Sequence, residues 1–244
     1  METALKNEIL RGVVGSTAHG TAIDGQDDRD EMGIFIEPAE NVCGLAPLDH
    51  YIYRDKPAGV RSEAGDLDLT LYSLRKFCRL AAKGNPSVLV LLWLPDYLVK
   101  TAAGERLIGI RDAFHSQDAG RAFLGYLVSQ KKALKGERTK KVNRPELVEK
   151  YGFDTKFAMH ALRLGYEGIE YMQHGTLTLP APEPRLSVLR GVRQGRYSLA
   201  DTLALIDEAD AQLVDLVERF TSHADTARIN EFLVDEHLAH WLRP

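Results

Sequence analysis

The chain of 244 residues carries a formal net charge of −4, with 44% hydrophobic and 27% charged residues. A chain of this length and composition can bury a core in one large domain or two small ones, which excludes wholesale disorder. Its two cysteines indicate neither a disulfide framework nor a zinc cluster, and its longest apolar run, residues 88–95, is too short to span a membrane, so we expect a soluble, cytoplasmic protein without a membrane partner.

The first hundred residues alternate between strand and helix patterns. Residues 8–16 predict a strand that stops at Gly15, and residues 32–38 predict a second strand closed by a proline. In residues 65–73, leucines alternate with polar side chains, as they do in a half-buried strand. These three segments predict a small sheet.

Two helices are expected after the third strand. Ser73 can cap a helix over residues 74–83, which Gly84 ends. An Asn-Pro pair then starts another helix, whose body is residues 87–94. This half of the chain is therefore predicted to be mixed α/β, with helices covering the sheet.

From about residue 117 the periodicity is helical and strand patterns fade. The longest helices are predicted, with good capping residues before two of them, over residues 118–135, 155–174, 199–220 and 226–242. We therefore predict an α+β fold, with a small mixed sheet and flanking helices in residues 1–110, followed by an all-helical domain in residues 111–244.

Four acidic residues crowd into residues 27–31, directly before the second strand. On an extended strand, Asp28 and Asp30 point the same way, about 6.5–7 Å apart. Two such carboxylates beside a core are costly unless a cation lies between them, and hard oxygen ligands suit Mg²⁺. The alternative, a solvated acidic loop, stays open at this point.

A third carboxylate and a phosphate-binding turn are also available. Asp66 and Asp68 share one face of the third predicted strand, so a site for two ions about 4 Å apart is plausible. In the turn before the acids, Gly15 lets phosphates approach the backbone, and Ser16 offers a hydroxyl and nearby N–H groups as donors.

This order of elements resembles the polymerase-β-type nucleotidyltransferase superfamily, whose signature is Gly-Ser, a short spacer and two acids one residue apart. Gly15, Ser16, Asp28 and Asp30 match that signature. Segments such as "DLTLYSLRKFCRLAAKGNPSVLVLLW" and "YGFDTKFAMHALRLGYEGIEYM" give a narrower resemblance, over residues 10–215, to the predicted nucleotidyltransferases of RNA-repair operons and phages.

The resemblance implies a nucleotidyltransferase palm as the catalytic domain, using two Mg²⁺ ions, which Mn²⁺ can replace. The family's metal pair falls on Asp28 and Asp30, and its third carboxylate falls on Asp68, with Asp66 ranked second. One departure is visible: Val90 stands where a glutamate is expected after "NPSVL".

A cationic stripe lies on the predicted helix 155–174. At about 100° per residue, Lys156, His160 and Arg163 share one side, joined by Glu167 and Glu170. Three cations in two turns suit a triphosphate, and the resemblance makes them the expected nucleotide contacts, as it does Gly15 and Ser16. An exposed seam of ion pairs is the alternative.

Residues 131–144 hold seven basic residues and one acid, so they could grip a nucleic-acid backbone or form a solvated linker. We hypothesise a metal-dependent, ATP- or other NTP-binding transferase that moves a nucleoside monophosphate to a hydroxyl and releases pyrophosphate. An RNA end, including a tRNA end, is the preferred acceptor in RNA repair or tRNA modification. The alternative hypothesis is a non-catalytic nucleotide- or RNA-binding module on the same fold, and the oligomeric state is left open.

Overall fold

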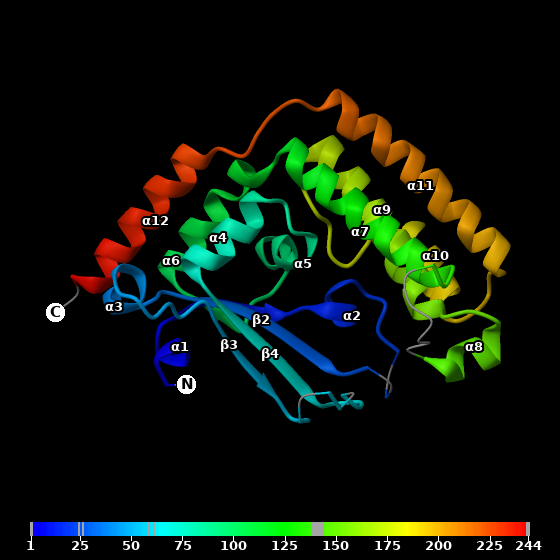
Figure 1. Ribbon diagram of the computed structural model, residues 1–244, viewed down its shortest axis with the longest axis horizontal. Helices are drawn as coiled ribbons and strands as arrows, with labels where there is room; N and C mark the ends of the chain where they lie inside the picture. Colours follow the sequence, from blue (N-terminus) through cyan, green and yellow to red (C-terminus); the bar gives the residue numbers. More distant parts are fainter. Residues whose placement is uncertain are drawn as a thin grey trace. The chain divides into compact units, whose positions relative to one another are not determined.

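The computed structural model describes residues 2–242 apart from residues 24, 26, 58, 61 and 138–143. The predicted α+β class is confirmed: a five-stranded mixed sheet with flanking helices is followed by a helical region (Figure 1). The chain forms two compact units, of which the first comprises Met1–Phe114 and Ala224–Pro244 and the second His115–His223.

The sheet belongs to the first unit and has the strand order β3-β4-β2-β1-β5. Its strands are β1 (Glu8–Val13), β2 (Arg29–Phe35), β3 (His50–Arg54), β4 (Leu67–Ser73) and β5 (Val99–Lys100). β2 and β4 are parallel, whereas the other neighbouring pairs are antiparallel. The first residues of β2 and β4 therefore lie side by side at the same end of the two strands, and this is where the predicted acids lie.

The three predicted strands correspond to β1, β2 and β4, with shifted ends. β1 ends at Val13, and β2 begins at Arg29 rather than at residue 32, which places Asp30 inside the sheet. β3 and β5 were not predicted. β3 is an edge strand with largely exposed side chains, and β5 has two residues, so neither has the apolar alternation of a half-buried strand.

Helices and two 3₁₀ turns complete the first unit in its described residues. They are α1 (Glu2–Lys6), α2 (Gly15–Ala18), α3 (Ala39–Cys43), α4 (Leu74–Ala82), α5 (Pro86–Leu89), η1 (Val90–Trp93), α6 (Ala102–Gly109), η2 (Arg111–Phe114) and α12 (Thr226–Trp241). The predicted caps are confirmed. The hydroxyl of Ser73 accepts a hydrogen bond from the backbone N–H of Lys76, and the side-chain oxygen of Asn85 accepts one from the backbone N–H of Ser87. The single helix predicted over residues 87–94 was wrong: α5 tightens into η1 there.

One face of the sheet is apolar at one end and acidic at the other. Figure 1 shows α4, α5 and α6 on one side of the sheet. Leu10 and Ile34, which face each other across β1 and β2, are fully buried. Because side chains alternate along a strand, Asp30 lies on the same face as Ile34, four residues before it. The opposite face buries Leu69 and Leu71 against Ala4 of α1.

The second unit consists of helices in its described residues. They are α7 (Gln117–Leu134), α8 (Pro145–Tyr151), α9 (Thr155–His174), α10 (Arg185–Arg193) and α11 (Leu199–Arg219). α9 packs against α7, α10 and α11, and thirteen of its residues are buried, which fits its nearly continuous apolar sequence. The predicted caps are confirmed, because Asp154 accepts from two N–H groups of α9 and Ser198 accepts from the N–H of Asp201.

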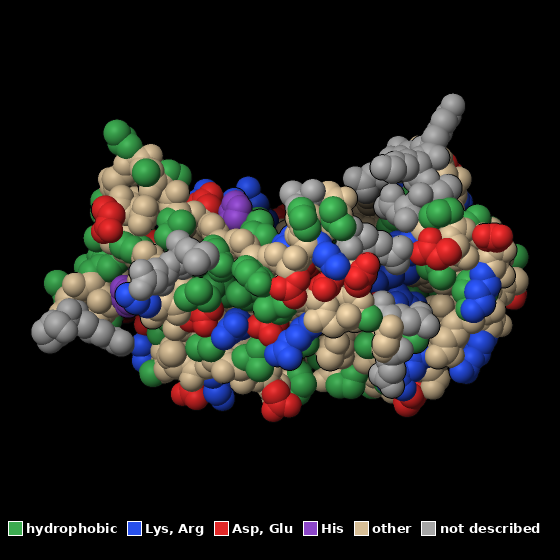
Figure 2. All heavy atoms as spheres, turned by 90° about the horizontal axis from the view of Figure 1, so that it is seen from below, with side chains coloured by type: hydrophobic (Ala, Val, Ile, Leu, Met, Phe, Trp, Pro, Cys, Tyr) green, Lys and Arg blue, Asp and Glu red, His purple; other side chains and the backbone are tan. Residues whose placement is uncertain are grey.

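The helices and the surface charge bear on the predicted absence of a membrane partner and on the predicted nucleic-acid partner. None of the described helices is long and apolar enough to cross a membrane. On the face seen in Figure 2, acidic and basic side chains are interspersed. The surface charge of that face therefore agrees with the small net charge and does not by itself indicate a nucleic-acid partner.

The last helix, α12, belongs to the first unit, where it packs against α4 and η2. The imidazole of His237 lies 3.0 Å from a carboxylate oxygen of Glu37, and the indole N–H of Trp241 donates to the carbonyl of the same residue at 2.8 Å. Arg106 donates twice to the buried Glu236. In the observed units, Ala224–Pro244 is grouped with Met1–Phe114, and the contacts of Glu37 with His237 and of Arg106 with Glu236 hold α12 there.

The Glu37–His237 pair makes stability depend on pH. Burial opposes ionisation of both groups, but their mutual hydrogen bond prevails, so the pKa of Glu37 is lowered and the pKa of His237 is raised. A raised histidine pKa stabilises the fold below its ordinary value of 6.5 and loses that effect as the pH rises through the folded-state value. The lowered pKa of Glu37 stabilises the fold above 4.5 and loses that effect on acidification.

We therefore predict that His237→Gln lowers the free energy of unfolding by about 1–3 kcal/mol at pH 6 and by less at pH 9. Urea unfolding at both pH values measures the difference, with the exposed His223→Gln as the control. A loss that is equal at both pH values would show that the pair is not ionised.

Candidate metal centre

The three predicted carboxylates converge at the start of β2 and β4. Asp30 and Asp68 face each other in the parallel register, and Asp28 lies two residues before Asp30. One carboxylate oxygen from each residue lies within 4.8 Å of the other two, and all three residues are half-buried. In the described part of the chain, this is the group of acidic, histidine or cysteine side chains that is close enough to hold an ion.

The donor set fits a hard divalent cation. Carboxylate oxygens are the ligands that Mg²⁺ prefers, at about 2.1 Å, so an ion would bring neighbouring oxygens to within about 3–4 Å of each other. The three carboxylate oxygens already lie within 4.8 Å of one another, so at most small side-chain rotations would bring them to that separation. The arrangement can therefore hold one or more divalent ions next to an incoming phosphate.

Gly15 is the residue that lets Asp30 stand where it does. Its φ is +63°, in the region that favours glycine, and a Cβ added to it would overlap the carboxylate of Asp30. The N–H of Val14 donates to the backbone carbonyl of Asp30 at 2.9 Å, which ties the turn to β2. The Gly-Ser turn and the acidic strand are thus one structural unit.

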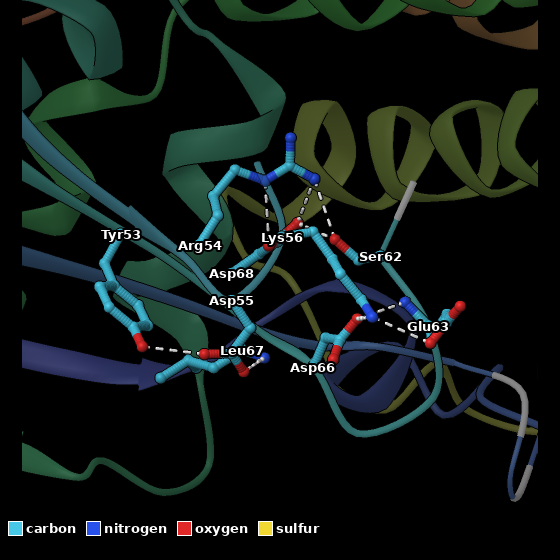
Figure 3. A network of polar contacts seen from close by, with 9 residues as sticks. All are labelled: Tyr53, Arg54, Asp55, Lys56, Ser62, Glu63, Asp66, Leu67 and Asp68. Atoms are coloured by element: carbon cyan, nitrogen blue, oxygen red, sulfur yellow. Dashed lines mark hydrogen bonds and ion pairs between the residues drawn. The ribbon is translucent and has the colours of Figure 1, made fainter. Parts of the chain in front are cut away.

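Asp68 is held by a network that the sequence did not reveal (Figure 3). The guanidinium of Arg54 donates to both carboxylate oxygens, at 3.0 and 2.9 Å, and the hydroxyl of Ser62 donates to one of them at 2.9 Å. The hydrogen bond from Arg54, together with that from Ser62, outweighs burial and lowers the pKa of the Asp68 carboxyl. Asp68 is therefore ionised over a wide pH range, as a metal ligand must be.

The remaining acids have other partners. Asp66, ranked second as the third carboxylate, accepts from the N–H of Glu63 at 2.7 Å and so closes the loop before β4. Asp27 accepts from the N–H of Ile23 at 2.9 Å. Glu31 is buried on the opposite face of β2, where it pairs with Arg11 and Arg29. The acids that lie close together in the sequence are therefore separated in the structure: three form one cluster, and the others make contacts elsewhere.

The predicted cationic stripe lies on α9, in the second unit. Arg163 is buried and donates to both carboxylate oxygens of Glu167, at 2.9 and 2.7 Å. Its other terminal nitrogen lies 3.0 Å from Nε2 of His160, one turn earlier, and Lys156 lies a turn earlier still. The structure thus brings His160 and Arg163 together and shows that Glu167 orients the arginine.

Val90 and the basic segment over residues 131–144 were also noted in the sequence. Val90 is buried in η1, so no carboxylate is present at that position. In the basic segment, Lys131 pairs with Asp207 and Asp210, while residues 138–143 lie outside the described residues.

Comparison with known proteins places the chain beside nucleotidyltransferases. A model of the RNA repair pathway DNA polymerase beta family matches residues 4–235. An uncharacterised 38.9 kDa protein of Enterobacteria phage T4, from the nrdC–mobD intergenic region, is 27% identical over 136 residues. That match takes in 53% of this chain and 40% of the phage protein, so the chain spans well under half of that relative's length.

A solved structure is also similar to the chain. It is a nucleotidyltransferase-like protein from Exiguobacterium sibiricum, 12% identical, with a TM-score of 0.33 over all of this chain and 78% of that one. At this score the fold assignment rests on the strands and helices described above.

The contact between Gly15 and Asp30 leads to a prediction about stability. Gly15→Ala should lower the free energy of unfolding by about 1–3 kcal/mol more than Gly25→Ala, because alanine at position 15 must displace the Asp30 carboxylate. Gly25 is a matched control: its φ is +71°, and a Cβ there has nothing within 4 Å. Urea unfolding of both variants gives the comparison, and an equal cost would contradict the close approach.

Proposed function

The chain belongs to the RNA repair pathway DNA polymerase beta family, and from this membership we propose that it is a metal-dependent nucleotidyltransferase. The reaction moves a nucleoside monophosphate from an NTP to a hydroxyl. The hydroxyl oxygen bonds to the α-phosphorus, the bond from that phosphorus to the bridging oxygen breaks, and pyrophosphate leaves as the hydroxyl loses its proton.

One observation supports this proposal beyond the family match: Asp28, Asp30 and Asp68 each place a carboxylate oxygen within 4.8 Å of the others, and Asp30 lies against Gly15. Polymerase-β-type enzymes typically use divalent metals, and three carboxylates in this arrangement are a suitable set of ligands. Surface acids with no common role would not need a glycine next to one of them to make room for its carboxylate.

The three carboxylates have two different roles in the proposal. Asp28 and Asp30 would hold both ions, and Asp68 would hold the ion on the acceptor side. Mg²⁺ bound there would neutralise the phosphates and favour loss of the hydroxyl proton. The lowered pKa of Asp68 supports a role as a ligand rather than as a proton carrier, because the carboxyl stays ionised near neutral pH.

The triphosphate is assigned to backbone and cationic groups. Gly15 and Ser16 would cradle its oxygens, since the turn begins beside Asp30. Lys156, His160 and Arg163 would stabilise its charge. The hydrogen bonds from Arg163 to Glu167 support this role in part, because they orient the guanidinium next to His160.

The acceptor is proposed to be an RNA end, including that of a tRNA. The description of the family, which names RNA repair, supports this choice more than surface charge does. The basic residues between 131 and 144 would add salt-dependent contacts to a phosphate backbone.

A non-catalytic nucleotide- or RNA-binding module is the second candidate function. The observation that favours it is Val90, a buried aliphatic residue where the resemblance leads us to expect glutamate. Calorimetry separates the two candidates: this module would bind NTP without regard to Mg²⁺ and would release no pyrophosphate.

We predict that the full chain transfers label from at least one α-labelled NTP to a mixed RNA pool in the presence of Mg²⁺. Asp30→Asn should lower the rate by roughly 100- to 1,000-fold, because it removes a charged ligand from the centre of the site. Label transfer resolved by gel electrophoresis measures the rate and identifies the RNA species that is modified.

The matched control is Glu40→Gln, which removes an exposed acid of α3 in the same unit. It should retain the wild-type rate. Unchanged transfer by a folded Asp30→Asn variant, with folding checked by circular dichroism, would refute the assignment of the site.

A further inference from the structure

Arg54 stands directly against one of the three acids. It is the last residue of β3 and faces Asp68 across the antiparallel ladder. Its Nε and Nη2 donate to the two oxygens of Asp68, and Nη2 also donates to the hydroxyl of Ser62 at 2.9 Å. Figure 3 shows the guanidinium lying over the carboxylate, with Ser62 beside both.

The loop between β3 and β4 keeps these groups in place. Asp55 accepts from the N–H of Leu67 at 2.7 Å and from the hydroxyl of Tyr53 at 2.9 Å, and it closes the base of the loop. Nearer the tip, the amine of Lys56 pairs with Glu63 at 3.0 Å. These contacts, drawn in Figure 3, make the position of Ser62 a property of the loop rather than of one side chain.

The contacts of Asp68 leave little room for a further cation. A carboxylate can accept about four hydrogen bonds, and Asp68 accepts three from Arg54 and Ser62. A divalent ion bound to Asp68 would lie within a few ångströms of the guanidinium, and like charges at that separation repel. The field at Arg54 comes from all three acids, since Asp68, Asp28 and Asp30 each raise its pKa.

We infer that Arg54 is an internal counter-ion of the three carboxylates, which holds Asp68 and releases it to the divalent ion that the reaction needs. This inference rests on the proposed function, because it assumes that Asp68 is a metal ligand. It assigns a role to a residue outside the Gly-Ser and Asp-x-Asp motifs: Arg54 sets how strongly the site binds metal.

The exposure of the pair is suited to such an exchange. The side chain of Arg54 is 36% exposed, so its guanidinium can turn into solvent at small cost, whereas that of Asp68 is 20% exposed and stays at the sheet edge. Ser62 can keep its hydrogen bond to Asp68 when Arg54 leaves, so the carboxylate remains oriented. Before an ion binds, the charge of Arg54 limits the repulsion among the three acids.

The test is Mn²⁺ binding by the full chain without nucleotide, followed through the electron paramagnetic resonance signal of free Mn²⁺. Arg54→Gln should tighten Mn²⁺ binding by roughly three- to tenfold, as expected for loss of one positive charge close to the ion. Lys56→Gln is the matched control, since it removes a cation of the same loop that contacts Glu63 and Asp66 rather than Asp68. It should change the dissociation constant by less than about twofold.

The outcomes separate the inference from the proposed function. Equal or weaker Mn²⁺ binding by Arg54→Gln, with binding by the wild-type chain, would overturn the inference alone and leave Arg54 as a support for Asp68. Equal tightening by Lys56→Gln would also overturn it, because the effect would then reflect net charge. Absence of Mn²⁺ binding in both the wild-type chain and Arg54→Gln would refute the metal site itself.

A second variant, Arg54→Lys, serves if Arg54→Gln fails to fold. It keeps the charge but loses the two-pronged contact, so it should bind Mn²⁺ more tightly by a smaller factor. Unchanged or weaker binding by Arg54→Lys would overturn the inference.

Discussion

The in-register parallel pairing of β2 with β4 is the constraint on which the rest of the structure depends. It runs from Arg29 opposite Leu67 to Phe35 opposite Ser73, and within it Asp30 faces Asp68. A slip of one residue would turn Asp68 to the other face of the sheet. The register is fixed by the apolar end of the same strands, where Ile34 and Leu71 are fully buried on opposite faces. Burial of the core and assembly of the acidic cluster are therefore consequences of one pairing.

The cost of crowding acids is met by dividing them among different partners. Glu31 turns to the face opposite Asp30, where two arginines compensate its charge, and Asp27 accepts from a backbone N–H group. The remaining three carboxylates meet, and Arg54 compensates part of their charge through Asp68. Gly15 then gives Asp30 the space that any side chain would take. The sequence tolerates this repulsion at a single place, as functional sites commonly do.

Elements of the fold and acids of the cluster could be predicted where they follow from local sequence patterns. They could not be predicted where contacts between residues far apart in the sequence determine the structure. Alternation and capping located β1, β2, β4 and the long helices α7, α9 and α11, because each has a continuous apolar face or a clear cap. Spacing also led to Asp28 and Asp30 and left Asp66 and Asp68 as alternatives, between which the family resemblance ranked Asp68 first. Arg54 was missed because its strand is an exposed edge, although the aromatic and β-branched residues of "HYIYR" are a strand signal that could have been followed. The return of α12 to the sheet unit depends on Glu37 and His237, which are 200 residues apart, and no local pattern reports such a contact.

We propose that Asp28, Asp30 and Asp68 together bind divalent ions. The most direct measurement is anomalous diffraction at the manganese edge from crystals of the protein grown with Mn²⁺ and a non-hydrolysable NTP analogue. We predict at least one anomalous peak at bonding distance, about 2.1–2.3 Å, from oxygens of these three side chains. An ordered nucleotide with no manganese peak at the three carboxylates, or with manganese bound elsewhere, would contradict it.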